Sequence, residues 1–192
     1  MLNRALLPVI LAASAAGCVS FGADPPPSLL TLTAARAIPA GASTTGPASS
    51  ALAVLEPNTE QRLNVTRVPV QTSDSSLAYL KDAVWVEKPA RLFQSLVAET
   101  IRAKGNRLVV REGDLGYNAV TTLSGQLLDM GYDVATGSVV VRYDGVLQRA
   151  EGEVQTRRFE SRVPAAADAA AVGPALNQAA NQVANEVAEW VG

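Results

Sequence analysis

The sequence contains no histidine and only one cysteine among its 192 residues. Without histidine, the chain lacks the commonest general base and metal ligand, and it lacks every catalytic triad built on an imidazole. A lone cysteine forms neither an internal disulfide nor a thiolate metal cluster. The sequence also has no G-x-S-x-G nucleophile elbow and no phosphate-binding glycine loop. We therefore expect neither an enzyme nor a protein that holds a metal or another cofactor.

An excess of charge of one sign is also missing. The chain carries 16 lysine and arginine residues against 18 aspartate and glutamate residues, which gives a formal charge of −2. This balance predicts no binding to nucleic acid, which requires a basic patch, and no polybasic contact with a membrane surface. Aromatic residues make up only 5% of the chain, but hydrophobic residues reach 48%. That share suffices for the core of one folded domain.

The single cysteine, Cys18, ends an N-terminal segment that has the pattern of an export signal. Arg4 supplies the positive start, and the run "ALLPVILAASAA" supplies an apolar stretch that is too short to span a bilayer. The residues "AAGC" at 15–18 resemble a lipobox, although the position three residues before the cysteine holds alanine where leucine is commonest. We interpret residues 1–17 as a lipoprotein signal peptide that is cleaved after Gly17.

Processing of this kind attaches diacylglycerol to the sulfur of Cys18 and usually acylates its new amino group. Several acyl chains on one residue give stable membrane anchoring, whereas one chain binds only marginally. The residue after the cysteine is Val19 and not aspartate. By resemblance to enterobacterial sorting, this favours the periplasmic face of the outer membrane. The alternative is an ordinary secretory signal followed by a buried or incidental cysteine.

The rest of the chain divides into a tether and one domain. Residues 18–27 end in three consecutive prolines, which favour an extended spacer. Residues 28–192 predict a single α+β domain with a mostly antiparallel sheet and two helices packed on one face. Hydrophobic periodicity and turn residues predict strands at 28–34, 51–57, 63–70, 106–111, 118–130, 138–149 and 153–163, a hairpin-like element around Lys81-Asp82, and helices at 90–104 and 172–190.

A few polar side chains could carry chemistry. Asp129, Asp133 and Asp144 could converge on a cation or act as acid and base, but solvated carboxylates paired with Arg142 or Arg149 are the more common arrangement. Arg157 and Arg158 could bind a lipid phosphate. Because neighbours on a strand point to opposite faces, an exposed or ion-paired strand face fits these two arginines better.

Large side chains and amides offer candidate contacts. Trp85 is a candidate partner-binding residue, since tryptophan is enriched at interface anchors, or else a core residue. Tyr79 is a second candidate partner-binding residue on the same segment. Trp190 fits the core better. The asparagines at 177, 181 and 185 form one stripe on the last helix. We interpret it as a solvent face, with a helix–helix or homo-oligomer contact as the alternative.

The run "RVPVQTSDSSLAYLKDAVWVEKPARLFQSLVAETI" at 67–101 resembles the ABC-type transport auxiliary lipoprotein family, which includes paraquat-inducible protein C. The resemblance extends to "VVVRYDGVLQRAEG", "RRFES" and "ALNQAANQVANEVAEWV" and covers nearly the whole mature chain. Its most specific element is a tyrosine and a tryptophan followed by a proline and a leucine-rich helix, here Tyr79, Trp85, Pro89, Leu92, Phe93 and Leu96.

The resemblance implies a role and not a reaction. Family members accompany an ABC permease and ATPase and a periplasmic protein with mammalian-cell-entry (MCE) domains, in systems that move phospholipids or other hydrophobic molecules. The chain would then be an outer-membrane lipoprotein that docks the MCE protein. Two alternatives remain, namely a periplasmic lipoprotein that binds a lipid or hydrophobic ligand itself, and an envelope assembly lipoprotein unconnected to transport.

Overall fold

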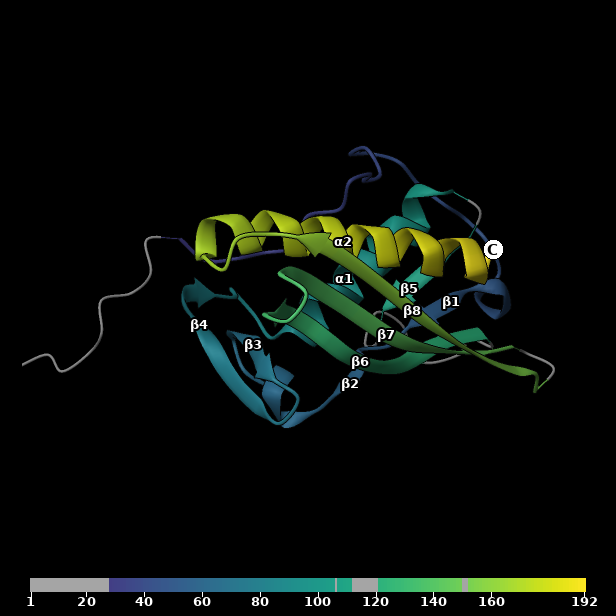
Figure 1. Cartoon of the computed structure of the whole chain (residues 1–192). Helices are drawn as coiled ribbons and strands as arrows, with labels where there is room; N and C mark the ends of the chain where they lie inside the picture. Colours follow the sequence, from purple (N-terminus) through teal and green to yellow (C-terminus); the bar gives the residue numbers. More distant parts are fainter. Residues whose placement is uncertain (1–27, 106, 112–120, 150–151) are drawn as a thin grey trace, which may run out of the picture.

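The computed structural model describes residues 28–105, 107–111, 121–149 and 152–192 (Figure 1). The predicted signal peptide, cleavage position Gly17, lipid attachment residue Cys18 and tether lie outside the described residues. The described part forms an eight-stranded mixed sheet and two α-helices, which confirms the α+β class.

The three longest strands form the predicted antiparallel meander. β6 (Thr121–Asp133), β7 (Ser138–Gln148) and β8 (Val154–Pro164) follow one another and pair along nearly their whole lengths. Alternating apolar and polar residues in each strand set the register, because a slip by one residue would move the apolar set to the opposite face.

The other edge of β6 carries strands that run parallel to it. These are β1 (Leu52–Val54), β2 (Asn58–Thr59) and β3 (Arg67–Ser73). β5 (Val109–Arg111) lies parallel to β1, and β4 (Ser76–Val84) is antiparallel to β3. Short 3₁₀ turns lie at Ala48–Ser50 and Gln61–Leu63. The sheet is therefore partly parallel, since the helix between β4 and β5 carries the chain back across the sheet.

Both helices cover the same face of the sheet (Figure 1). α1 (Pro89–Ala103) begins at the predicted proline and is followed by Gly105 with φ 76°. α2 (Ala169–Val191) begins three residues earlier than predicted, because the Asp168 side chain accepts a hydrogen bond from the Ala171 amide and caps it there. Pro174 lies inside α2, where it removes only one backbone donor near the helix start.

The segment 28–34 does not form the predicted strand. It makes one isolated parallel bridge, between Leu30 and Trp85, and then continues along α2. There the amides of Thr33 and Ala35 donate to the side-chain oxygens of Asn177 and Asn181 at 2.8 and 2.7 Å. We call Leu30–Ala35 the N-terminal strap.

The strap corrects the interpretation of the asparagine stripe. The Asn181 side-chain amide donates to the Thr33 carbonyl at 2.9 Å, and this asparagine is only 8% exposed. Asn185 is exposed to solvent. Two asparagines of the stripe therefore hold the strap. Its backbone groups form hydrogen bonds with these side chains, where a strand would form them with the backbone of a neighbouring strand. Gly173 leaves room for Leu30, whose Cδ2 atom would lie 2.8 Å from an added Cβ.

The hairpin predicted at Lys81-Asp82 is also wrong. β4 continues through these residues, and the turn lies at Asp74 and Ser75, between β3 and β4. Asp82 has φ 59°, and the pairing register shifts between Pro69–Tyr79 and Arg67–Val84. The extra residues form a bulge in β4. A bulge interrupts the alternation of apolar and polar side chains along the strand, and the sequence prediction interpreted this interruption as a turn.

The core lies between the helices and the sheet and contains most of the aromatic side chains. Phe93, Tyr143, Phe159 and Trp190 contact one another in sequence, with ring centroids 5.2 to 6.3 Å apart. Burial raises the pKa of Tyr143 well above its usual range. Trp85 is 1% exposed and belongs to the core, which is the alternative interpretation of this residue.

Candidate functional site

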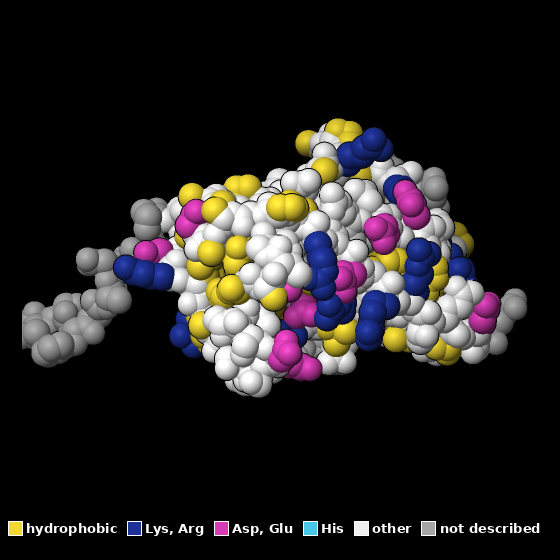
Figure 2. Space-filling model, viewed as in Figure 1, with side chains coloured by type: hydrophobic (Ala, Val, Ile, Leu, Met, Phe, Trp, Pro, Cys, Tyr) yellow, Lys and Arg dark blue, Asp and Glu magenta, His cyan; other side chains and the backbone are white. Residues whose placement is uncertain are grey.

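The face of the sheet opposite the helices carries a set of ion-paired side chains. On β7, Val139, Val141 and Tyr143 point toward the helices, whereas Arg142 and Asp144 point away from them. Figure 2 shows arginine and lysine side chains lying beside aspartate and glutamate side chains below α2. We call this side of the sheet the open face.

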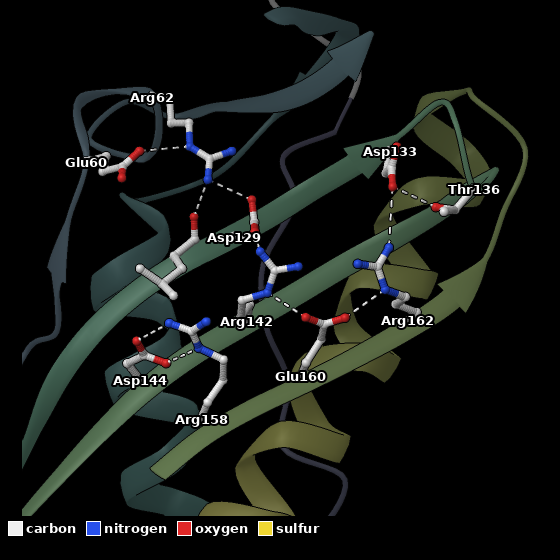
Figure 3. Close-up of polar contacts among 11 residues, drawn as sticks. Glu60, Arg62, Asp129, Asp133, Thr136, Arg142, Asp144, Arg158, Glu160 and Arg162 are labelled. Atoms are coloured by element: carbon white, nitrogen blue, oxygen red, sulfur yellow. Dashed lines mark hydrogen bonds and ion pairs between the residues drawn. The ribbon is translucent and has the colours of Figure 1, made fainter. Parts of the chain in front are cut away.

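Three strands and a 3₁₀ turn contribute to one continuous ion-pair network (Figure 3). Asp129 on β6 accepts from Arg62 at 2.7 Å and from Arg142 at 2.6 Å. Arg142 also contacts Glu160 on β8. Glu160 in turn accepts from Arg162 at 2.7 Å, and Arg162 reaches Asp133 at 3.3 Å. The network therefore connects elements that lie far apart in the sequence.

A separate pair lies beside this network. Arg158 on β8 donates through Nε and Nη2 to the two carboxylate oxygens of Asp144 on β7, at 2.6 Å each. This bidentate geometry is the strongest form of an arginine–carboxylate contact. The neighbouring Arg157 points to the opposite face, where its guanidinium lies 5.0 Å from the Phe159 ring centre. The prediction that the two arginines face opposite sides is confirmed.

The pKa values of three carboxylates on the open face are lowered, which favours their ionised forms. A hydrogen bond from Thr136 lowers the pKa of Asp133, and the backbone amide of Ala135 and Arg162 act in the same direction. The hydrogen bond from Arg158 lowers the pKa of Asp144, and that from Arg142 lowers the pKa of Glu160. A general acid needs a raised pKa, so these residues suit charge pairing better than proton transfer.

The structure does not bring the three predicted aspartates together. Asp129, Asp133 and Asp144 each contact a different arginine, and within the described residues no three acidic side chains converge as metal ligands would. Arg142 is a partner as predicted, while Arg158 and Arg162 take the place of Arg149.

A groove of about 660 Å³ lies between this network and the β3–β4 hairpin. Its floor is formed by the outward side chains of β6, β7 and β8, and its wall by the hairpin. Gly131 allows the close approach of the two, because an added Cβ would lie 2.4 Å from the Pro69 carbonyl oxygen. The lining residues are Arg62, Pro69, Gln71, Asp74, Ser75, Ser76, Leu77, Asp129, Gly131, Tyr132, Asp133, Val140, Arg142 and Arg162.

Tyr79 lies next to this groove. Its ring is half-buried beneath the Arg67 guanidinium, 3.9 Å from the ring centre, and its hydroxyl donates to the Arg62 carbonyl at 3.5 Å. Sequence reasoning missed Arg62, Glu160 and Arg162. The many charges in "EVQTRRFESRV" pointed to an exposed strand and thus to the last two. No sequence pattern indicated Arg62, because it reaches the network from a short 3₁₀ turn, which has no repeating pattern of apolar residues.

Two solved structures share this arrangement of strands and helices. Protein XCC0632 from Xanthomonas campestris, a DUF330 protein, matches with a TM-score of 0.72 and 19% sequence identity over 85% of this chain and 93% of its own. An uncharacterized protein matches with a TM-score of 0.66 and 18% identity over 75% of this chain and 93% of its own. At these identities the likeness shows the fold alone. No curated protein matches the sequence.

The model of the ABC-type transport auxiliary lipoprotein component family matches residues 30–188. Because this match spans most of the chain, the protein belongs to that family, as the sequence resemblance indicated. The family is one of lipoproteins that are components of ABC-type transport systems. Among the residues that the structure describes, no helix combines the length and apolar character needed to cross a bilayer.

Proposed function

We propose that the protein is an outer-membrane lipoprotein of an MCE-type ABC transport system for phospholipids or other hydrophobic molecules. In this role it docks the periplasmic MCE protein and has no catalytic activity of its own. The observation that supports docking is the groove on the open face, which is lined by ion-paired arginines and carboxylates. Family membership supports the connection to an ABC transport system.

The groove has the properties of a protein-docking surface. Its arginines are held in place by carboxylates on neighbouring strands, so a partner meets side chains that have already lost much of their rotamer freedom. Leu77 adds an apolar side chain that is 39% exposed at the groove wall. Arginine is enriched at interfaces, and charge complementarity favours the correct partner and orientation.

The alternative of a lipid carrier fits the described residues less well. An acyl chain requires an apolar cavity, whereas the groove is lined by several charged side chains, among them Arg142, Asp129 and Asp133. The apolar side of the sheet is filled by the two helices and the aromatic side chains between them. We therefore favour a protein partner over a bound lipid.

Anchoring is the second part of the proposal. Lipid attached to Cys18 after cleavage behind Gly17 would hold the domain at the membrane, and Val19 supports the outer membrane. Labelling cells with radioactive palmitate and fractionating the membranes tests this, with Cys18→Ser as the control variant. An unlabelled wild-type protein in the soluble fraction would contradict the anchor.

Co-purification with the MCE protein of the same envelope tests docking. We expect Arg162→Glu to reduce the recovered partner severalfold, because it places a third carboxylate beside Glu160 and Asp133. Arg91→Glu is the matched control, since this arginine is 64% exposed on α1, on the other side of the sheet. Equal recovery with both variants, each with an unchanged thermal midpoint, would exclude the groove as the docking surface.

A further inference from the structure

We propose that the end of the domain nearest the lipid anchor rests on the lipid surface itself. The contact is made by Leu29, Val84, Val86, Arg67 and Tyr79, which we call the anchor-side patch. The inference rests on the proposed attachment of lipid at Cys18, and it assigns a second surface beside the docking groove, none of whose lining residues belongs to the patch.

The bridge between the strap and the end of β4 forms the apolar part of this patch. The Leu30 amide donates to the Val84 carbonyl at 2.7 Å, and the Val86 amide donates to the Leu30 carbonyl at 2.9 Å. The Trp85 side chain points into the core, and the Leu30 side chain is partly buried against it. The adjacent residues along each segment, Leu29, Val84 and Val86, therefore point away from the core.

These outward neighbours are exposed to an unusual degree. Leu29 is 51% exposed and Val86 is 50% exposed, while Val84 between them is half-buried. Only four large hydrophobic residues of the described part are at least half exposed, and two of them, Leu29 and Val86, flank this one backbone bridge. A cluster of this kind indicates a contact surface more than scattered single residues do.

The neighbouring strand adds a cation and an aromatic ring. Arg67 on β3 lies opposite Val84 in the sheet, and its guanidinium stacks on the ring of Tyr79, at 3.9 Å from the ring centre. Tyrosine and arginine combine an apolar body with a polar end, and both are suited to the level of lipid headgroups. Glu87 directly follows Val86, and its carboxylate is paired with the Arg91 guanidinium at 3.9 Å, so its negative charge beside the patch is partly neutralised.

The length of the tether argues for lipid as the occupant. Ser28 follows Cys18 by ten residues, which span at most about 36 Å when fully extended. Leu29 is the next residue, so the patch begins where the tether reaches the domain. A surface held this close to the bilayer meets it at a high effective concentration, and a weak contact then suffices.

The test uses the mature lipidated protein in vesicles of phosphatidylethanolamine and phosphatidylglycerol. An environment-sensitive fluorophore is attached to Val86→Cys, where it is the only reactive thiol because Cys18 is acylated. Val154→Cys is the matched control, since Val154 is 56% exposed at the start of β8, at the opposite end of the molecule (Figure 1). Leu29→Cys provides a second position within the patch.

We expect nitroxide-labelled lipid to quench the fluorophore severalfold more strongly at positions 86 and 29 than at 154, with blue-shifted emission at the first two. Vesicle flotation is measured in parallel. If the protein floats but all three positions are quenched equally weakly, the patch does not contact lipid and the anchor still stands. A shift that arises only after the MCE protein is added would also overturn the inference, since the patch would then be a protein interface. Failure to float would refute the anchor and the inference with it.

Discussion

On β7, the side chains of Val139, Val141 and Tyr143 pack under the two helices, whereas Arg142 and Asp144 project from the open face. Each set alternates with the other along one strand. The inner set is excluded from water, while the carboxylates and guanidiniums of the open face keep roughly 20 to 63% of their side-chain surface exposed. Solvent therefore screens the ion pairs but does not reach the core.

This difference separates stability from recognition. Apolar burial on the inner face contributes most of the free energy of folding, because each large side chain loses nearly all its contact with water. Part-exposed ion pairs contribute little to that free energy. They instead hold arginines in defined positions along the groove, which is the property that a docking surface requires. Substitutions on the two faces should accordingly differ in size and in kind.

The largest effect is expected from Phe159→Ala on the inner face. Phe159 is 1% exposed and contacts both Tyr143 and Trp190, so its removal leaves a cavity between strands and helix. We expect a loss of about 3–5 kcal/mol in the free energy of unfolding. Urea denaturation followed by circular dichroism measures it, with Val154→Ala on the same strand as the control. A loss as small as that of the control would mean that the aromatic contacts do not stabilise the fold.

Gly131→Ala tests the point where the groove wall meets the sheet. The new Cβ would lie 2.4 Å from the Pro69 carbonyl oxygen, so β3 must move away from β6. We expect a destabilisation of about 1–3 kcal/mol, measured by urea denaturation, together with faster amide exchange in β3. Gly137→Ala distinguishes a clash from a general loss of glycine, because nothing lies within 4 Å of its added Cβ, although its φ of 59° adds some strain. Unchanged exchange in β3 would contradict this account.

Asn181→Ala tests the strap. It removes the acceptor for the Ala35 amide and the donor to the Thr33 carbonyl. We expect a loss of about 1–2 kcal/mol and faster hydrogen exchange at the Ala35 amide. Asn185→Ala lies on the same stripe but is exposed, and alanine favours helix, so this control should be neutral or slightly stabilising. Similar exchange rates in both variants would show that the asparagine side chain does not hold the strap.

The smallest effect is expected on the open face and depends on pH. The pKa of Glu160 is lowered in the folded state, so its contribution to stability is present above its unfolded pKa of about 4.3 and is lost as the pH falls through the folded value. Glu160→Gln should cost about 1 kcal/mol or less at pH 7, because the side chain is 34% exposed. In urea titrations at stepped pH, the difference from wild type should shrink as the pH falls below about 4.3 and vanish once the pH is below the lowered folded pKa. A difference that grows at acid pH would reverse the assigned sign.

Elements that depend on local periodicity could be predicted from the sequence. The helix at Pro89–Ala103 and the three strands of the meander follow from apolar spacing and from proline and glycine at their ends. The failures share a different cause. At Lys81-Asp82 a bulge imitates a turn, and at 28–34 an alternating segment is held by helix side chains instead of a strand. In both cases the deciding contacts come from another part of the chain.

The candidate site shows the same division. The sequence indicated several charged residues on strands with alternating apolar and polar side chains, namely Asp129, Asp133, Asp144 and Arg142. It also predicted that the aspartates pair with arginine. The bond from Arg62 to Asp129 was not predicted, since 67 residues separate the two and no local pattern relates them. Trp85 illustrates the same limit, because burial depends on what packs over a side chain, here in part the strap that bridges to it at Leu30.

By itself, the sequence determined which side of each meander strand is apolar, where α1 begins and which residue types are missing, because these properties depend only on residue identity and spacing. Only the tertiary structure decided that two asparagines fasten the strap, that Trp85 is covered and that Arg62 completes the ion-pair network over the groove. The physical reason is that hydrogen bonds, burial and ion pairs depend on distances in space, and for these residues the partners come together only when the sheet and helices have packed.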